Sequence, residues 1–216
     1  MQPGLFITLE GVEGSGKTTQ AAIVGDVLRK SLHRSVTVTH EPGGTHVGEA
    51  IRAIFLDPAA ALAPGTELML VLADRAQHVR EKLRPALAAG EIVISDRYSD
   101  STIAYQGHGR GFDLKLLTEL NALASDGIAP DLTLVLDIPV QTGLARTAAR
   151  ARGTGRGADR IENEREEFHQ KVREGFLAIA KREPARVTVL DASQPVEAVT
   201  AAILSAIDVL IRRRCR

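Results

Sequence analysis

The stretch Gly11-Val12-Glu13-Gly14-Ser15-Gly16-Lys17-Thr18 decides the fold, because it matches the pattern G-x-x-x-x-G-K-[ST]. It follows an apolar run at residues 5–9 and precedes a segment with helical periodicity. The glycines let successive backbone N–H groups turn inward at the positive end of a helix, where they surround phosphates. Lys17 adds a positive charge, and Thr18 adds a hydroxyl suited to Mg²⁺. The stretch therefore predicts a site for the phosphates of a nucleoside triphosphate.

Short runs rich in β-branched and aliphatic residues recur along the chain, with longer helical patterns between them. They occupy residues 5–9, 36–39, 91–95, 132–136 and 187–190. Several runs are apolar on both faces, which suits a parallel sheet covered by helices on both sides. We therefore expect an α/β P-loop NTPase fold, with a five-stranded parallel sheet flanked by helices, formed by residues 1–216 as a single domain.

Apolar residues at helical spacing predict which faces of two helices are buried. They are Ile23, Val27, Leu28 and Leu32 after the first strand, and Leu114, Leu117, Leu120 and Leu123 later. Residues 196–211 predict a further amphipathic helix.

The charge balance favours a small partner. Lys plus Arg (27) equals Asp plus Glu (27), so no net field favours nucleic acid or an anionic membrane, and we expect neither. Cys215 is the single cysteine, which excludes an internal disulfide. We find no export signal at residues 1–4 and no apolar run of roughly 18 residues, so we expect a cytoplasmic protein.

Charged residues follow two other strands and should lie at the same edge of the sheet. Asp96 and Arg97 follow residues 91–95, Glu41 follows residues 36–39, and Arg52 lies on a helical segment eleven positions later. Asp96 can hold Mg²⁺ or its waters, and Arg97 can bridge the transferred phosphoryl group and an acceptor phosphate. The plainer alternative is a loop ion pair between Asp96 and Arg97.

Four other segments are open to plain structural interpretations. Arg75 could pair with Asp74 or Glu81 on a solvated helix face, and the glycines near Gln106 could form only a turn. Residues 57–65, rich in Ala and Pro, predict a surface connection. Residues 150–160, rich in Arg and Gly, are too polar for the core and could close over an anion.

In this order and spacing, these segments resemble the bacterial thymidylate kinase family of nucleoside monophosphate kinases, over nearly the whole chain. The resemblance is carried by the phosphate loop and by Glu41-Pro42-Gly43-Gly44-Thr45, Ala73-Asp74-Arg75, Asp96-Arg97-Tyr98, Ala104-Tyr105-Gln106-Gly107, Pro130-Asp131-Leu132-Thr133, Asp159-Arg160, and Asp191-Ala192 followed by Gln194-Pro195. It implies phosphoryl transfer from ATP to dTMP, giving dTDP and ADP, with Mg²⁺ as the cofactor. It also implies a homodimer.

The resemblance assigns residues to the two substrates. The ATP side would comprise Gly11, Val12, Glu13, Gly14, Ser15, Gly16, Lys17, Thr18, Thr19, Arg146, Ala192 and Gln194. The dTMP side would comprise Glu41, Pro42, Arg52, Val71, Arg75, Arg97, Ser101, Thr102, Tyr105 and Gln106. Thr18 and Asp96 would hold the metal.

Within these sets, the resemblance implies particular roles. Arg52 and Arg97 would bind the dTMP phosphate, and Arg75 and Gln106 would face the thymine edge. Tyr105 would stand near the sugar, where its ring can crowd out a 2′-hydroxyl.

A small Arg-rich lid at approximately residues 147–161 is also implied. Because Val12, Glu13 and Ser15 leave the phosphate loop without an Arg, the lid should supply a catalytic guanidinium. We favour Arg152, with Arg156 as the alternative. The predicted catalytic residues are thus Lys17, Arg97, Glu13 and Arg152.

Two residues depart from the family pattern. Val71 stands where many relatives place a Phe that stacks on thymine, which should weaken base binding by on the order of 1 kcal/mol. His40 stands where an Arg is common, and we interpret it as a solvent-exposed residue at a strand end.

Two other function classes remain open from the residues alone. One is another P-loop small-molecule kinase, and the other is a nucleotide-gated switch protein, because both share the phosphate loop. Arg52 and Arg97 favour a phosphorylated acceptor, and Arg75 with Gln106 favours a pyrimidine.

Overall fold

The computed structural model describes residues 4–32, 34–155 and 157–214. In this part of the chain, five parallel strands form one sheet in the order β2-β3-β1-β4-β5. The strands are β1 (Leu5–Glu10), β2 (Val36–His40), β3 (Ile92–Asp96), β4 (Leu132–Asp137) and β5 (Val187–Asp191). The predicted α/β fold with a five-stranded parallel sheet is therefore confirmed.

The order of the strands explains their apolar character. Strand β1 lies at the centre of the sheet, where Ile7 pairs with Ile94 of β3 on one side and with Leu132 of β4 on the other. All six residues of β1 are buried, as are the five residues of β3. The edge strand β5 exposes Val189, because one side of an edge strand has no neighbour.

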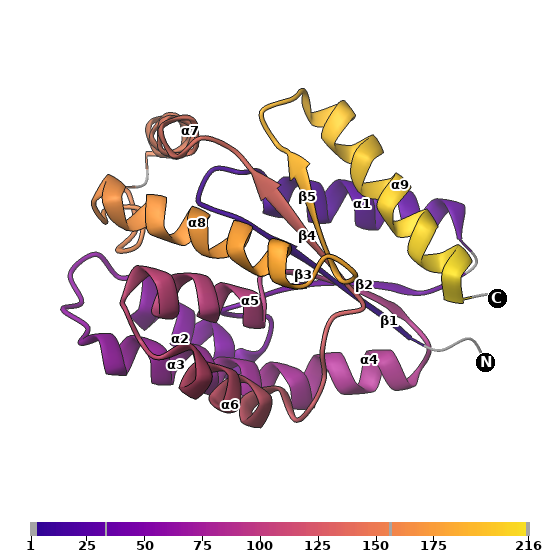
Figure 1. Cartoon of the computed structure of the whole chain (residues 1–216), viewed down its shortest axis with the longest axis horizontal. Helices are drawn as coiled ribbons and strands as arrows, with labels where there is room; N and C mark the ends of the chain where they lie inside the picture. Colours follow the sequence, from indigo (N-terminus) through magenta and orange to yellow (C-terminus); the bar gives the residue numbers. More distant parts are fainter. Residues whose placement is uncertain (1–3, 33, 156, 215–216) are drawn as a thin grey trace.

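Helices cover both faces of the sheet (Figure 1), with α1 and α9 on one side and α3, α4 and α6 on the other. The helices are α1 (Lys17–Ser31), α2 (His46–Leu56), α3 (Pro64–His78), α4 (Arg84–Ala88), α5 (Ser99–Thr102), α6 (Leu114–Ser125), α7 (Val140–Thr154), α8 (Glu166–Arg182) and α9 (Val196–Arg214). Two π-helical segments, η1 (Val79–Leu83) and η2 (Ile103–Gly109), continue α3 and α5.

Within the described ranges, no helix is both long enough and apolar enough to cross a membrane.

The predicted buried faces of α1 and α6 are wrong at one position each. Val27 and Leu123 are 36% and 79% exposed. In α1 the buried stripe is centred on Ala21, Val24 and Leu28, because the helix approaches β2 at Gly25. A Cβ at Gly25 would lie 2.4 Å from Val38 Cγ2, so the closest point of the helix is the glycine and not Val27.

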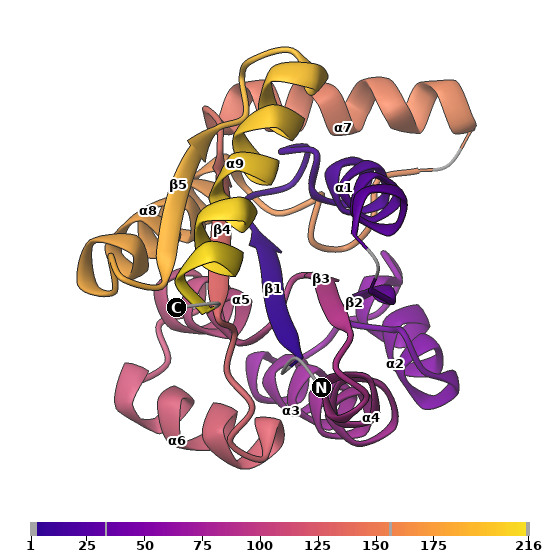
Figure 2. The same cartoon turned by 90° about the vertical axis from the view of Figure 1, so that its right-hand side faces the viewer.

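The arginine-rich and alanine-rich stretches are more ordered than their composition indicated. Helix α7 continues to Thr154, so residues 150–154 belong to a helix. The surface connection after α2 covers residues 57–63, and Pro64 already begins α3. Helix α7 lies beyond the carboxyl ends of the strands in both views (Figures 1 and 2), so the helix stands over that edge of the sheet.

Candidate functional site

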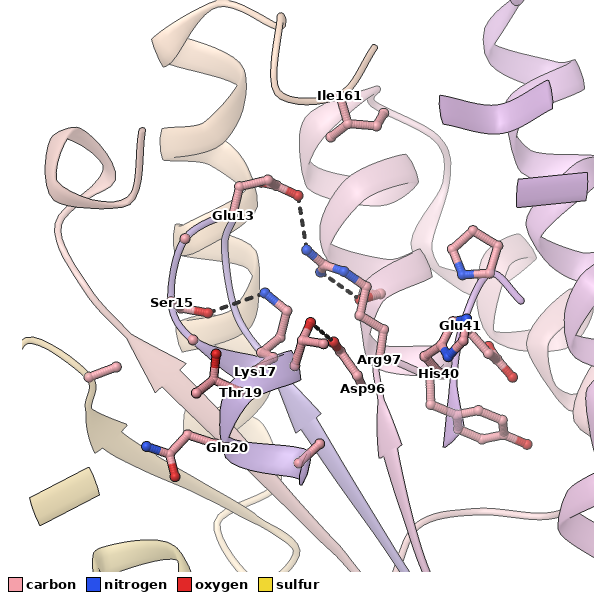
Figure 3. A pocket seen from close by; sticks show the side chains of 18 of the residues that line it. Glu13, Ser15, Lys17, Thr19, Gln20, His40, Glu41, Asp96, Arg97 and Ile161 are labelled. Atoms are coloured by element: carbon pink, nitrogen blue, oxygen red, sulfur yellow. Dashed lines mark hydrogen bonds and ion pairs between the residues drawn. The ribbon is translucent and has the colours of Figure 1, made fainter. Parts of the chain in front are cut away.

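A cavity of about 960 Å³ opens at the carboxyl edge of the sheet (Figure 3). Most of the predicted site residues line it: Glu13, Gly14, Ser15, Gly16, Lys17, Thr18, Thr19, Glu41, Pro42, Arg52, Val71, Arg75, Asp96, Arg97, Ser101, Thr102, Tyr105, Gln106, Arg146, Ala192 and Gln194. Gly11, Val12 and Arg152 do not line it. The fold thus brings the two predicted substrate sides together in one space.

The phosphate loop packs tightly onto the base of α7. Gly14 has φ +72°, and a Cβ there would lie 2.2 Å from the carbonyl oxygen of Gly143. Gly16, at φ +92°, occupies the left-handed region directly before α1 begins at Lys17. Only glycine adopts these conformations at little cost, and they aim the first N–H groups of α1 into the cavity.

Lys17 is buried inside the loop that it follows. Its Nζ donates to the carbonyl oxygens of Gly11 (3.0 Å) and Val12 (2.8 Å) and to Ser15 Oγ (3.2 Å). Burial, together with the charge of Arg97, lowers the pKa of Lys17 to about 8. Gly11 and Val12 therefore contribute to the site by holding this ammonium group rather than by facing the cavity.

Thr18 and Asp96 meet across the first turn of α1. The Thr18 hydroxyl donates to Asp96 Oδ2, and Asp96 Oδ1 is buried without a hydrogen-bond partner among the described residues. A hydroxyl oxygen and a carboxylate oxygen are ligands that Mg²⁺ accepts. These two residues therefore fit the predicted metal.

The backbone at Arg97 is strained in a way that Glu10 offsets. Arg97 has φ +73°, which a non-glycine residue rarely adopts. The Glu10 carboxylate accepts hydrogen bonds from the Tyr98 N–H (2.8 Å) and the Ser101 hydroxyl (2.6 Å), which fixes the turn. Burial, reinforced by the charge of Asp100, raises the pKa of Glu10 to about 8.

The Arg97 side chain points across the cavity to the phosphate loop. Its Nη2 donates to Glu13 Oε1 at 2.9 Å (Figure 3), and its Nη1 donates to the Gly11 carbonyl oxygen at 3.1 Å. The guanidinium carbon lies 4.8 Å from the centre of the Tyr105 ring. The alternative of an ion pair between Arg97 and Asp96 is therefore wrong, because each group has a different partner.

Arg75 lies at the bottom of the cavity and is only 2% exposed. Its Nε donates to Glu41 Oε2 (2.9 Å), and its Nη1 donates to Thr102 Oγ1 (2.9 Å) and Asn121 Oδ1 (2.6 Å). The alternative of a solvated helix face is therefore wrong for Arg75. The charge is buried because Glu41, from another strand end, neutralises it.

The remaining acceptor-side residues are held by neighbours of the cavity. Gln106 Nε2 donates to Glu67 Oε1 at 2.9 Å, and Arg52 Nη1 donates to the Pro42 carbonyl oxygen at 2.8 Å. Gln106 belongs to the π-helical segment η2, so the alternative of a simple glycine turn is wrong. His40 lies 3.0 Å from Glu49 with a 40% exposed side chain, as expected for a strand end.

The lid arginines differ in their positions. Arg150 lines the cavity and donates to Glu162, whereas Arg152 is exposed and Arg156 lies outside the described residues. Arg160 is not free to close over an anion, because its Nη1 donates to Glu67 Oε2 at 2.8 Å and its Nε donates to the Phe55 carbonyl oxygen at 2.9 Å. Its role in this structure is to anchor the end of the lid to α2 and α3.

Buried polar residues beside the cavity were missed by sequence reasoning. Glu10, Asn121 and His169 are 0%, 7% and 1% exposed. A charged residue directly after an apolar strand was an available signal for Glu10. Asn121 and His169 are single polar residues on amphipathic helices, which local sequence does not distinguish from surface positions.

Asp74 should make the unfolding free energy depend on pH. It is fully buried; burial, together with the charge of Glu41, raises its pKa to about 7 from 3.8. Between these values the folded protein holds a proton that the unfolded chain releases, so stability falls as the pH rises from about 4 to 7. The slope from this group is at most about 1.4 kcal/mol per pH unit.

Urea denaturation of the wild-type protein and the Asp74→Asn variant at several pH values measures this effect. We expect the variant to gain stability relative to the wild type as the pH rises. Asp26→Asn, at an exposed position of α1, is the control. Parallel pH profiles for the wild type and Asp74→Asn would exclude a shifted pKa.

Comparisons with known proteins agree with this geometry. A family model described as thymidylate kinase matches residues 9–203. The thymidylate kinase of Desulfovibrio desulfuricans is 48% identical over 215 residues, which cover 98% of this chain and 99% of that protein. The thymidylate kinase of Geobacter sulfurreducens is 51% identical over 213 residues, covering 97% and 98%. A crystal structure of thymidylate kinase from Ehrlichia chaffeensis is 33% identical, with a TM-score of 0.75, and the match covers 95% of this chain and 99% of that one.

Proposed function

This chain belongs to the thymidylate kinase family and is an ATP-dependent nucleoside monophosphate kinase; we propose that its cavity transfers the γ-phosphoryl group of ATP to dTMP, giving dTDP and ADP. The observation that carries the proposal is the shared cavity, which joins the phosphate loop to the acceptor-side arginines. Arg52, Arg75 and Arg97 enter it from three different elements, α2, α3 and the turn after β3.

The acceptor side suits a pyrimidine monophosphate. Arg52 and Arg97 provide guanidinium groups for the phosphate, which Arg binds in a fork. Arg75 and Gln106 are buried donors at the far wall, where they suit the carbonyl oxygens of thymine. Val71 covers one face of the base, and Tyr105 lies beside the sugar.

The donor side suits ATP. The loop and the first turn of α1 receive the triphosphate, as helix N-termini do. Arg146 Nη1 donates to the Ala192 carbonyl oxygen at 3.0 Å, so that its planar group stands at the wall where adenine would bind. Gln194 extends the same wall, and its Nε2 donates to Asp191 Oδ2 at 2.7 Å.

We propose that Mg²⁺ accompanies the nucleotide. Thr18 Oγ1 and Asp96 would hold it, and this assignment is supported by Asp96 Oδ1, which is buried without a hydrogen-bond partner in the described part of the chain. When bound there, the ion would offset negative charge on the phosphate oxygens.

The transfer requires position and charge more than it requires proton removal. A dTMP phosphate oxygen is already deprotonated at neutral pH, and it attacks the γ-phosphorus as the bond to the β–γ bridging oxygen breaks. Lys17 and Arg97 stabilise the negative charge of the transferred phosphoryl group from two sides. Glu13 positions Arg97 through the ion pair between them. We propose that lid movement adds a guanidinium from Arg152, with Arg150 already at the cavity.

A coupled assay of ADP release with ATP and a panel of monophosphates tests the proposal. We expect release that depends on dTMP, with kcat/KM about a hundredfold or more lower for dCMP, because its 4-amino group presents donors to the Arg75 donors. Preference for another acceptor would indicate a different kinase. Slow ATP hydrolysis that is the same across the panel would indicate a nucleotide-gated switch.

We further propose that the chain is a cytoplasmic homodimer. Ile54 of α2 and Met69 of α3 are 51% and 56% exposed, and the two helices contact each other, which supports an apolar contact surface there. Light scattering of the wild type and of an Ile54→Glu variant tests the assembly, and a monomeric wild type would contradict it.

A further inference from the structure

The carboxylate of Glu13 is held from three directions. Its Oε1 accepts hydrogen bonds from Arg97 Nη2 at 2.9 Å and from the Tyr105 hydroxyl at 2.5 Å. Its Oε2 lies 3.2 Å from Nδ1 of His169, a residue of α8. Arg97 and Tyr105 line the cavity, whereas His169 is 1% exposed and does not. His169 therefore reaches the cavity through Glu13.

The charge of Glu13 sets the direction of this hydrogen bond. Burial alone would raise the pKa of Glu13, but the charge of Arg97, the His169 hydrogen bond and the charge of Lys17 hold it well below its usual range. An ionised carboxylate only accepts hydrogen bonds, so the Nδ1–H group of His169 is the donor in this hydrogen bond.

The contacts of the described residues give Nε2 of His169 no role in stabilising the fold. It is buried without a hydrogen-bond partner among the described residues, and the ring packs edge-on against Phe168. An unpaired buried polar atom is destabilising, so an apolar ring at this position would serve packing better. The hydrogen bond to Glu13 is what distinguishes histidine from such a ring.

The other two contacts of Glu13 compete with the substrate. When dTMP binds, the Arg97 guanidinium would also donate to its phosphate and the Tyr105 hydroxyl would lie near its sugar, so both donors to Oε1 would be shared with the substrate. The hydrogen bond from His169 lies behind the cavity, where no substrate group competes for it.

We propose that His169 is a positioning residue for phosphoryl transfer, because it holds Glu13 in place while Arg97 and Tyr105 engage dTMP. This inference rests on the proposed function of the cavity. His169 touches neither substrate, and it acts on Arg97 through the Glu13 carboxylate.

Three substitutions of His169 separate this role from packing. Asparagine places an amide N–H near the position of Nδ1, glutamine places one near Nε2, and phenylalanine keeps the ring without a donor. We expect His169→Phe and His169→Gln to lower kcat by about 10- to 100-fold, as loss of a charge-assisted hydrogen bond does. His169→Asn should stay within about threefold of the wild-type kcat, because the needed donor is restored.

Thermal unfolding separates the two roles, because loss of a packing residue would lower the Tm. We expect the Tm of His169→Phe to stay near that of the wild type, because removal of the unpaired Nε2 offsets the loss of the donor to Glu13. Lys171→Ala, at an exposed position of α8, is the control and should change neither kcat nor Tm.

Several outcomes would overturn the inference. They are a wild-type kcat in His169→Phe, equal losses of kcat in the asparagine and glutamine variants, or losses of kcat that are proportional to losses of Tm. If His169→Phe does not fold, the comparison of asparagine with glutamine decides. A wild-type protein inactive on dTMP would overturn both this inference and the proposed function. An active wild type whose asparagine and glutamine variants have equal kcat would overturn this inference alone.

Discussion

Replacing Lys17 with alanine should lower kcat about a thousandfold, while the affinity for dTMP changes by less than about threefold. Lys17 Nζ lies within the loop formed by Gly11, Val12 and Ser15, where a triphosphate would be enclosed. Its charge therefore acts on the transferred phosphoryl group rather than on the acceptor. Turnover is measured by coupled ADP release, and dTMP affinity is measured by calorimetry without ATP.

Lys30→Ala is the matched control for this change. Lys30 lies on the same helix, α1, but is exposed at its far end. It should retain wild-type kcat. A Lys17→Ala variant with unchanged turnover would refute the assignment of the loop, and an equal loss of dTMP affinity would place Lys17 on the acceptor side instead.

Replacing Arg97 with lysine should lower kcat/KM for dTMP about a thousandfold, although the positive charge remains. The guanidinium presently donates to Gly11, Ser101 and Glu13 at once, in a geometry that one ammonium group does not reproduce. Its fork is also what would align the donor and acceptor phosphates. Steady-state kinetics with dTMP as the varied substrate measures the effect.

Comparing dTMP with thymidine shows whether the effect arises at the phosphate. Binding of dTMP to Arg97→Lys should weaken, whereas binding of thymidine, which lacks the phosphate, should stay near the wild-type value. Arg213→Lys, on the exposed end of α9, is the control. An equal loss for both ligands would mean that Arg97 acts through the shape of the cavity and not through the phosphate.

The positions of individual lid residues illustrate a limit of sequence reasoning. Arg150, Arg152 and Arg160 are the same residue type within one short polar stretch. Nevertheless, Arg150 lines the cavity, Arg152 is exposed to solvent and Arg160 is hydrogen-bonded to Glu67. Glu67 is 93 positions away from Arg160, and it is the packing of α3 against the end of the lid that joins them. Local sequence contains no information about that contact.

The buried acceptor network shows the same limit. The hydrogen-bond partners of Arg75 come from the end of β2, from α5 and from α6, at separations of 34, 27 and 46 residues. Asp74 and Glu81, which are close to Arg75 in the sequence, were both plausible partners for it. Which partner it has depends on the order of strands in the sheet, because that order decides which strand ends meet.

The sequence by itself determined the phosphate loop and the strands, because both depend on neighbours in the chain. Glycines at fixed offsets set the loop conformation of residues 11–18, and apolar runs set strands that are buried on both faces. Only the tertiary structure decided that Glu13 contacts Tyr105 and His169, which lie 92 and 156 positions away. Those contacts require the crossovers of the parallel sheet to bring η2 and α8 to the loop, and no local pattern determines where a crossover ends.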